Sequence, residues 1–161
     1  MLMDMPAGIL RARDGMDGIS WNILGQTYVP KQICESSFSW HATLPAGTFV
    51  PPHIHPTQDE FLYILEGRFD FLLDGEENYA EPGDLVHMPR GIPHGIFNKS
   101  GATIKTLFWV APARRLYDLF WAIHNMGADP DPAKLVAVSA EHEIDFLPPP
   151  EDEGEAGEQE A

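Results

Sequence analysis

Three histidines and one glutamate have the residue types and the spacing that a site for a single metal ion requires. His53 and His55 lie two residues apart, so on an extended strand both side chains leave the same face. Prolines on both sides of this pair exclude a helix there. Glu60 follows a short polar turn, and His94 lies in a later segment before another short apolar run. Imidazole nitrogens with one carboxylate suit a divalent ion of iron, manganese, nickel, cobalt, copper or zinc.

The two segments that carry these residues have regular spacing. The first reads G-x5-H-x-H-x4-E-x6-G from Gly47 to Gly67, and the second reads G-x5-P-x-G-x2-H-x3-N from Gly83 to Asn98. Both resemble the two motifs of the cupins, with ten defined positions filled. The resemblance implies an all-β cupin fold, a jelly-roll (double-stranded β-helix) barrel in which four side chains surround one metal ion: His53, His55, Glu60 and His94.

The chemistry expected of such a site depends on its open positions. Four protein ligands on an octahedral ion leave about two positions for substrate and dioxygen, whereas tetrahedral zinc would leave none. Glu60 is the ligand that could leave the metal and take a proton from a phenol or an enol, so it is also the candidate catalytic base. The adjacent Asp59 points to the opposite strand face, and we expect it either to cap the turn or to hold a neighbouring group from outside.

A second resemblance concerns the segment after the barrel and the H-x-H-x4-E form of the first motif. Both are similar to single-domain cupins described as quercetin 2,3-dioxygenase-like. This resemblance implies a metal-dependent dioxygenase, an oxidoreductase acting on a phenolic or enolic small molecule. Two alternatives stay open: a metal-assisted isomerase or lyase that uses Glu60 without oxygen, and a non-catalytic module that only binds a small molecule.

The composition of the chain limits the number of domains and the classes of molecule that it could bind. The chain has 161 residues and 43% hydrophobic residues, enough for one domain with its own core. Its net charge of −15 argues against nucleic acid and anionic membranes as partners. The single cysteine, Cys34, allows no internal disulfide. No secretory signal and no apolar run of membrane-spanning length is visible, so a soluble cytoplasmic protein is expected.

Short apolar runs separated by turn residues predict barrel strands over 19–111, preceded by an N-terminal arm over 1–18. Asp74-Gly75 predicts a hairpin turn. The segment 112–147 changes to helical spacing, with Pro112 suited to a first turn and Gly127 to a stop. Asp131-Pro132 predicts the start of a second short helix. We assign both helices to the barrel domain, and residues 148–161 to a disordered acidic tail.

Strand parity gives a candidate substrate pocket. Side chains with the parity of the ligands should point inward, and two further histidines could reach the pocket from their strands. The candidate pocket residues are His41, Phe49, Leu62, Ile64, His87 and Ile96. This mostly apolar lining suits a flat aromatic or otherwise hydrophobic substrate better than a sugar phosphate. The resemblance also implies a homodimer, for which the outward aromatics Phe61, Tyr63 and Phe97 are candidate contacts.

Overall fold

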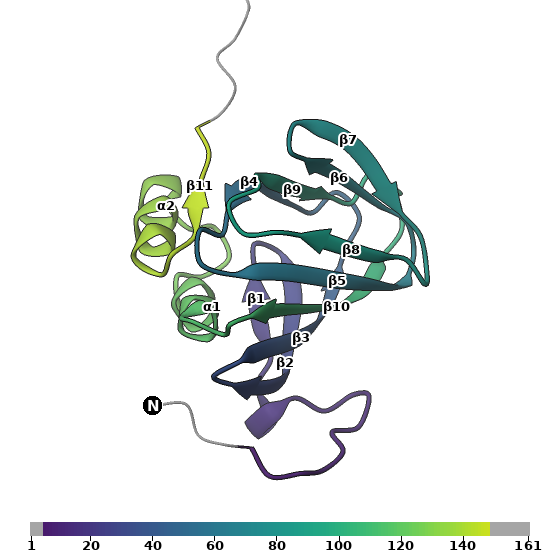
Figure 1. Cartoon of the computed structure of the whole chain (residues 1–161), viewed down its shortest axis with the longest axis vertical. Helices are drawn as coiled ribbons and strands as arrows, with labels where there is room; N and C mark the ends of the chain where they lie inside the picture. Colours follow the sequence, from purple (N-terminus) through teal and green to yellow (C-terminus); the bar gives the residue numbers. More distant parts are fainter. Residues whose placement is uncertain (1–4, 149–161) are drawn as a thin grey trace, which may run out of the picture.

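Two antiparallel sheets pack face to face in the structure, a computed structural model that describes residues 5–148 (Figure 1). One sheet has six strands in the order β1-β2-β3-β10-β5-β8, and the other has five in the order β11-β4-β9-β6-β7. The strands are Trp21–Ile23 (β1), Gln26–Cys34 (β2), Ser37–Leu44 (β3), Phe49–Ile54 (β4), Asp59–Glu66 (β5), Phe69–Leu73 (β6), Glu76–Ala80 (β7), Leu85–Met88 (β8), His94–Phe97 (β9), Ile104–Ala111 (β10) and Asp145–Phe146 (β11). The helices are the 3-10 turn Met16–Gly18 (η1), Leu116–Asn125 (α1) and Pro132–Glu141 (α2). The expected all-β jelly-roll architecture is confirmed.

The core lies between the sheets because the central strands alternate. Every second residue of β3 is buried, and β10 shows the same alternation beside it. Trp40 of β3 pairs with Phe108 of β10 in register, and their rings stack with centroids 5.2 Å apart. A period of two puts one face of each strand into the core. The alternation of apolar and polar residues between positions 37 and 44 matches this buried face.

The hairpin between β6 and β7 turns at Asp74-Gly75, as expected. Leu73 pairs with Glu76, and the two residues between them have positive φ angles of 49° and 81°. A two-residue turn with two positive φ angles matches the twist of antiparallel strands, and Asp-Gly is one of the pairs that accept it. This hairpin continues the five-stranded sheet beyond β9.

The two C-terminal helices differ in one detail from the expectation. Pro112 does not begin a helix: α1 starts four residues later, at Leu116, after a turn. At its other end the helix stops before Gly127, as predicted, and Gly127 has a positive φ angle of 86°. Asp131 caps α2 as predicted: its side chain accepts a hydrogen bond from the Ala133 N–H, with Pro132 in the first turn.

Both helices lie at the same side of the barrel, and β11 returns from α2 to pair with β4 (Figure 1). No helix in residues 5–148 combines the length and the apolar character needed to cross a membrane. The predicted acidic tail falls almost wholly outside the described residues.

Candidate metal centre

The four expected ligands come from both sheets and from one loop. His53 on β4 pairs directly with His94 on β9, so these two rings are cross-strand neighbours in the five-stranded sheet. Glu60 lies on β5 of the six-stranded sheet, and His55 lies in the connection between β4 and β5. All four side chains are buried, with 1% to 5% of their surface exposed. The site therefore sits inside the barrel, between the sheets.

The geometry of the four side chains fits one cation. One ligand atom from each lies within 4.8 Å of the others. Ligands on opposite sides of an ion, each about 2.1 Å from it, are separated by about 4.2 Å, so this spacing suits a shared ion. An Oε2 atom of Glu60 lies 2.8 Å from Nε2 of His55 and 3.0 Å from Nε2 of His94. Donor type and spacing together match a site with three imidazoles and one carboxylate.

Backbone carbonyl oxygens that contact Nδ1 of two of the histidines determine which ring nitrogen is available to bind a metal. Nδ1 of His53 lies 2.8 Å from the Pro51 carbonyl, and Nδ1 of His94 lies 3.3 Å from the Ile92 carbonyl. A carbonyl only accepts, so each Nδ1 is the donor and each Nε2 keeps its lone pair for a metal. These backbone contacts orient the imidazoles before any ion arrives.

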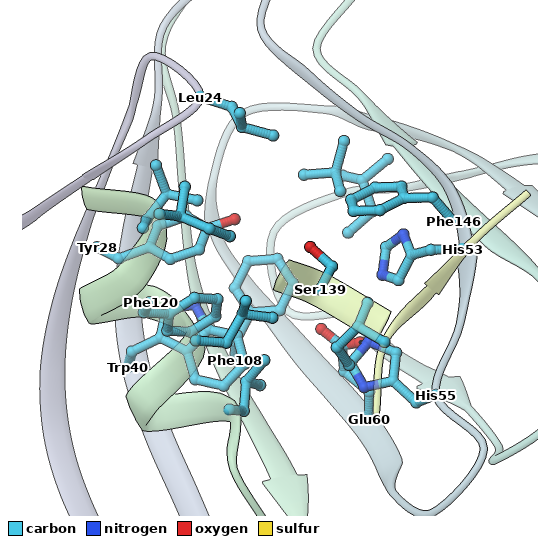
Figure 2. A pocket seen from close by; sticks show the side chains of 17 residues that line it. Leu24, Tyr28, Trp40, His53, His55, Glu60, Phe108, Phe120, Ser139 and Phe146 are labelled. Carbon is cyan, nitrogen blue, oxygen red and sulfur yellow. Dashed lines mark ion pairs between the residues drawn. The ribbon is translucent and has the colours of Figure 1, made fainter. Parts of the chain in front are cut away.

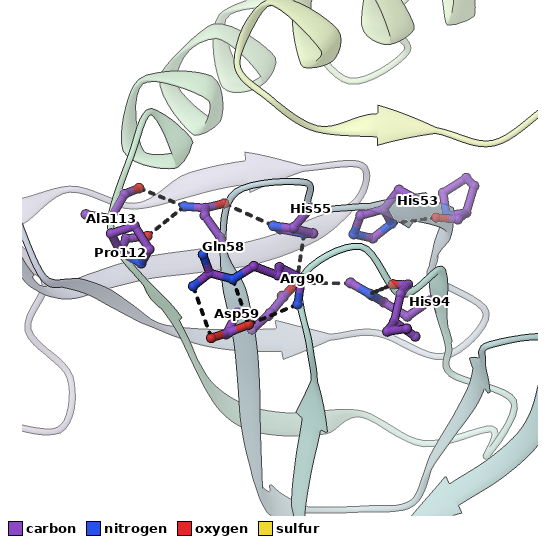
Figure 3. A network of polar contacts seen from close by, with 11 residues as sticks. His53, His55, Gln58, Asp59, Arg90, His94, Pro112 and Ala113 are labelled. Carbon is purple, nitrogen blue, oxygen red and sulfur yellow. Dashed lines mark hydrogen bonds and ion pairs between the residues drawn. The ribbon is translucent and has the colours of Figure 1, made fainter.

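His55 is oriented by a side chain that the sequence analysis did not single out. Its Nδ1 lies 3.0 Å from Oε1 of Gln58, whose Nε2 donates to the carbonyls of Pro112 and Ala113 at 3.1 and 2.8 Å (Figure 3). Gln58 is 1% exposed. The amide thus connects a metal-ligand candidate to the segment that leads into α1. A glutamine between two ligand candidates was the only available signal.

Asp59 holds the second motif from outside, as expected. Its Oδ1 accepts a hydrogen bond of 2.9 Å from the Arg90 N–H, and its carboxylate also pairs with the Arg90 guanidinium (Figure 3). Hydrogen bonds from Arg90, with its charge, hold the pKa of this carboxyl below its usual range. The loop before His94 is also tied to the first motif by the Gly91 N–H, which donates to the His55 carbonyl at 3.0 Å.

The electrostatics of the centre favour the ionised form of Glu60. Burial alone would raise the pKa of Glu60, but the charges and hydrogen bonds of His55 and His94 hold it well below its ordinary value. Burial and the two neighbouring imidazoles lower the pKa of His53, so this ring stays neutral. A carboxylate anion and a neutral imidazole are the protonation states that a metal ion requires.

A cavity of about 60 Å³ opens beside the ligands (Figure 2). Three of the four ligand candidates form its polar side, and His94 is not among the lining residues. The remaining wall is almost entirely apolar and is shared by the barrel, α1 and the β11 region. It consists of Ile23, Leu24, Tyr28, Trp40, Val50, Ile96, Phe108, Leu116, Leu119, Phe120, Ile123, Ser139, Ile144 and Phe146. The helices therefore close the barrel end that holds the site.

Of the candidate pocket residues, Ile96 lines this cavity. Phe49 does not: it is 51% exposed, because an irregularity in the β4–β9 register between Val50 and His53 reverses the parity and brings Val50 inward instead. Leu62 and Ile64 point inward but are buried in the core away from the cavity. These three placements correct the pocket inferred from parity.

The two candidate pocket histidines lie elsewhere. His87 on β8 pairs with Phe61 and stacks on its ring at 4.9 Å, on the outer face of the six-stranded sheet. His41 lies in a shallow surface depression beside Lys105 and Glu66. Both alternate with buried neighbours, Met88 and Ala42, and this alternation turns them away from the site. Neither belongs to the cavity.

The sequence did not predict that most of these aromatic and aliphatic residues line the cavity. Trp40 and Phe120 form part of the cavity wall, and neither was among the predicted pocket residues. The apolar face of α1 was identified from its helical spacing, but its packing partner was not. Ser139 carried no recognisable signal, because a single serine on a short helix is ordinary.

Comparisons with known proteins agree with this geometry. Residues 40–110 match the family model described as cupin domain. Over these residues the chain is similar to a cupin domain. A cupin described as RmlC-like, from Shewanella frigidimarina NCIMB 400, superposes with a TM-score of 0.62 at 17% identity over 71% of this chain and 99% of that chain. At this identity the similarity shows the fold.

Curated relatives share parts of the cupin domain. The tetracenomycin polyketide synthase protein TcmJ of Streptomyces glaucescens is 32% identical over 77 residues, which are 48% of this chain and 52% of that protein. Quercetin 2,3-dioxygenase of Bacillus subtilis is 33% identical over 57 residues, which are 35% of this chain and 17% of that enzyme. The chain thus spans about half the length of the first relative and far less of the second. The resemblance to quercetin dioxygenases is partial.

Proposed function

We propose that this chain is a metal-dependent cupin enzyme, a dioxygenase that acts on a small phenolic or enolic molecule. The observation that carries the proposal is the convergence of three imidazoles and one carboxylate beside a mostly apolar cavity. Imidazole and carboxylate donors suit a divalent transition metal, and His53, His55, Glu60 and His94 would hold it. When bound, the ion supplies positive charge that stabilises a deprotonated substrate hydroxyl.

Glu60 is the proposed proton acceptor. Its carboxylate is anionic at neutral pH, as the lowered pKa indicates, and it faces the cavity. A phenol or enol that enters with its hydroxyl toward the histidines would transfer its proton to a Glu60 oxygen. His53, His55 and His94 stay fixed during this transfer, because each Nδ1 is already bonded to an oxygen acceptor.

The rest of the cavity supports an apolar reactant. Its wall excludes water and would accept dioxygen, which is itself apolar. A volume of about 60 Å³ holds only a few water-sized groups, well under the 300–1,000 Å³ common for drug-sized ligands. The proposal therefore favours small phenols and enols over a flavonol. The partial match to an enzyme named for quercetin, which is a phenolic compound, supports the same chemical class.

An oxygen electrode tests the proposal. The protein is loaded separately with iron, manganese, nickel, cobalt, copper and zinc, and each form is screened with small phenols, enols and, for comparison, quercetin. We expect oxygen consumption matched by product with at least one metal, and its loss in Glu60→Gln. His87→Ala, a change on the outer sheet face, is the matched control and should keep the activity.

Two outcomes would replace the proposal. Product formed without oxygen consumption would indicate an isomerase or lyase that uses the same base. Saturable binding with no product under any metal would indicate a binding module.

A further inference from the structure

Helix α2 buries one residue fully, and that residue is polar. Ser139 has no exposed surface, whereas Val136 on the same helix is 46% exposed. A surface helix ordinarily buries an apolar stripe. A serine at the one fully buried position therefore has to be explained by what its hydroxyl meets.

The Ser139 hydroxyl has no partner among the described residues. Serine in a helix often donates to the carbonyl four residues earlier, and this hydroxyl does not. Three other buried groups among the described residues also lack a partner: the Thr57 hydroxyl, and the indole N–H groups of Trp21 and Trp40, whose rings pack edge-on against aromatic neighbours. A buried unpaired hydroxyl is unfavourable, so its position needs a compensating contact.

The hydroxyl belongs to the wall of the metal-centre cavity. Figure 2 shows Ser139 pointing into the space that lies between the sides occupied by Tyr28 and His53 in that view. Tyr28 presents the other non-ligand hydroxyl of the wall, but it already donates to Gln26 Oε1 at 2.7 Å. Ser139 is thus the hydroxyl of the wall that is free both to donate and to accept.

We propose that Ser139 is a substrate-binding residue, whose hydroxyl bonds a second polar group of the molecule held at the metal centre. The inference rests on the proposed function, because it needs a small molecule in this cavity. It also defines that molecule further. One end carries an oxygen for the metal, the other carries a hydroxyl or carbonyl, and a short apolar body fits between them in about 60 Å³.

Short carboxylates test this in the cobalt-loaded protein. Propionate and butyrate carry only the metal-binding end, and 3-hydroxypropionate and 4-hydroxybutyrate add a terminal hydroxyl. Binding is followed through the visible absorption of cobalt. We expect at least one hydroxylated probe to bind more tightly than its parent, and this preference to fall about tenfold in Ser139→Ala. Ser37→Ala, which removes a hydroxyl bonded to Gln32 far from the cavity, should leave the preference unchanged.

Thermal unfolding of the metal-free proteins gives an independent readout. Removing a hydroxyl without a partner should leave the unfolding temperature of Ser139→Ala equal to or above that of the wild type. A lower temperature would show that the hydroxyl supports the fold, and would overturn the proposal. Equal probe preference in wild type and Ser139→Ala would overturn it as well. If no carboxylate perturbs cobalt in either protein, this inference fails, whereas the proposed function is decided by the oxygen electrode.

Discussion

Each of the three histidines is held by a contact to its Nδ1 atom, on the side of the ring away from the centre. Backbone carbonyls receive Nδ1 of His53 and His94, and a side-chain amide receives Nδ1 of His55. The contacts to backbone carbonyls do not depend on the identity of any side chain other than the histidine. The second depends on one replaceable side chain, Gln58, which makes that residue informative to change.

Loss of a ligand should empty the centre. His55→Ala and Glu60→Ala each remove one of four donors, and we expect each to weaken metal binding by more than about 100-fold, beyond the effect typical of a supporting residue. Metal analysis after purification without chelators measures this. His87→Ala, a histidine outside the cavity, is the control. Full metal content in both ligand variants would contradict the assignment.

Gln58→Leu should have a smaller effect of a different kind. The variant keeps all four donors but removes the partner of His55 Nδ1 and the hydrogen bonds from the Gln58 amide to the Pro112 and Ala113 carbonyls. We expect metal affinity to fall about 10- to 100-fold. Competition with a chromophoric chelator gives the affinity. Gln32→Leu, at a partly buried glutamine remote from the site, should bind metal like the wild type.

The strands and the C-terminal segment have different roles at the site. Strands β4, β5 and β9 and the β4–β5 connection supply the ligand candidates, while α1, α2 and β11 cover the cavity. An ion pair holds this cover: Nε of Arg114, before α1, donates to Oε2 of Glu143, after α2, at 3.0 Å. Hydrogen bonds and charge from Arg114 lower the pKa of Glu143.

Glu143→Gln should weaken the cover in a pH-dependent way. A lowered carboxyl pKa stabilises the fold above the pKa of the unfolded chain, and this stabilisation disappears as pH falls through the folded value. The variant should therefore unfold at most a few degrees below wild type at pH 7, with the difference vanishing below the ordinary glutamate range. Calorimetry across pH measures it. Glu141→Gln, two residues earlier, is the control, and an unchanged difference in acid would refute the explanation.

At the scale of the whole molecule, the outer face of the six-stranded sheet carries a row of stacked rings. Phe61 stacks between His87 and Trp109, with centroids 4.9 and 5.2 Å away, across three neighbouring strands. Tyr63 and Leu85 on the same face are 41% and 59% exposed. A continuous apolar patch of this kind is typical of an interaction surface. We propose that a second copy of the chain covers it.

A charge on this face should separate the copies. We expect the wild type to sediment at twice the chain mass of 17.9 kDa. Phe61→Glu should weaken association by at least about tenfold, because a charge would be buried at the centre of a symmetric interface. Tyr79→Glu, at an exposed tyrosine of β7 in the other sheet, should stay dimeric. A monomeric wild type, or a dimeric Phe61→Glu, would refute this interface.

The sequence by itself determined the elements whose signals are local. The alternation of β3, the Asp74-Gly75 turn and the Asp131 cap each depend on neighbours within a few residues, so physical rules for strands, turns and caps apply directly. The four ligand candidates were also accessible, because fixed spacing along two segments carries the resemblance to cupins.

Only the tertiary structure decided what surrounds those ligands. The irregularity in β4 that moves Phe49 outward arises from pairing with β9, which no local pattern encodes. Gln58 and Ser139 meet the site through contacts that span the fold: Gln58 bonds carbonyls 54 and 55 residues later, and Ser139 comes from the last helix. The cavity forms where α1, α2 and β11 close on the barrel, and its volume depends on their packing rather than on any one segment.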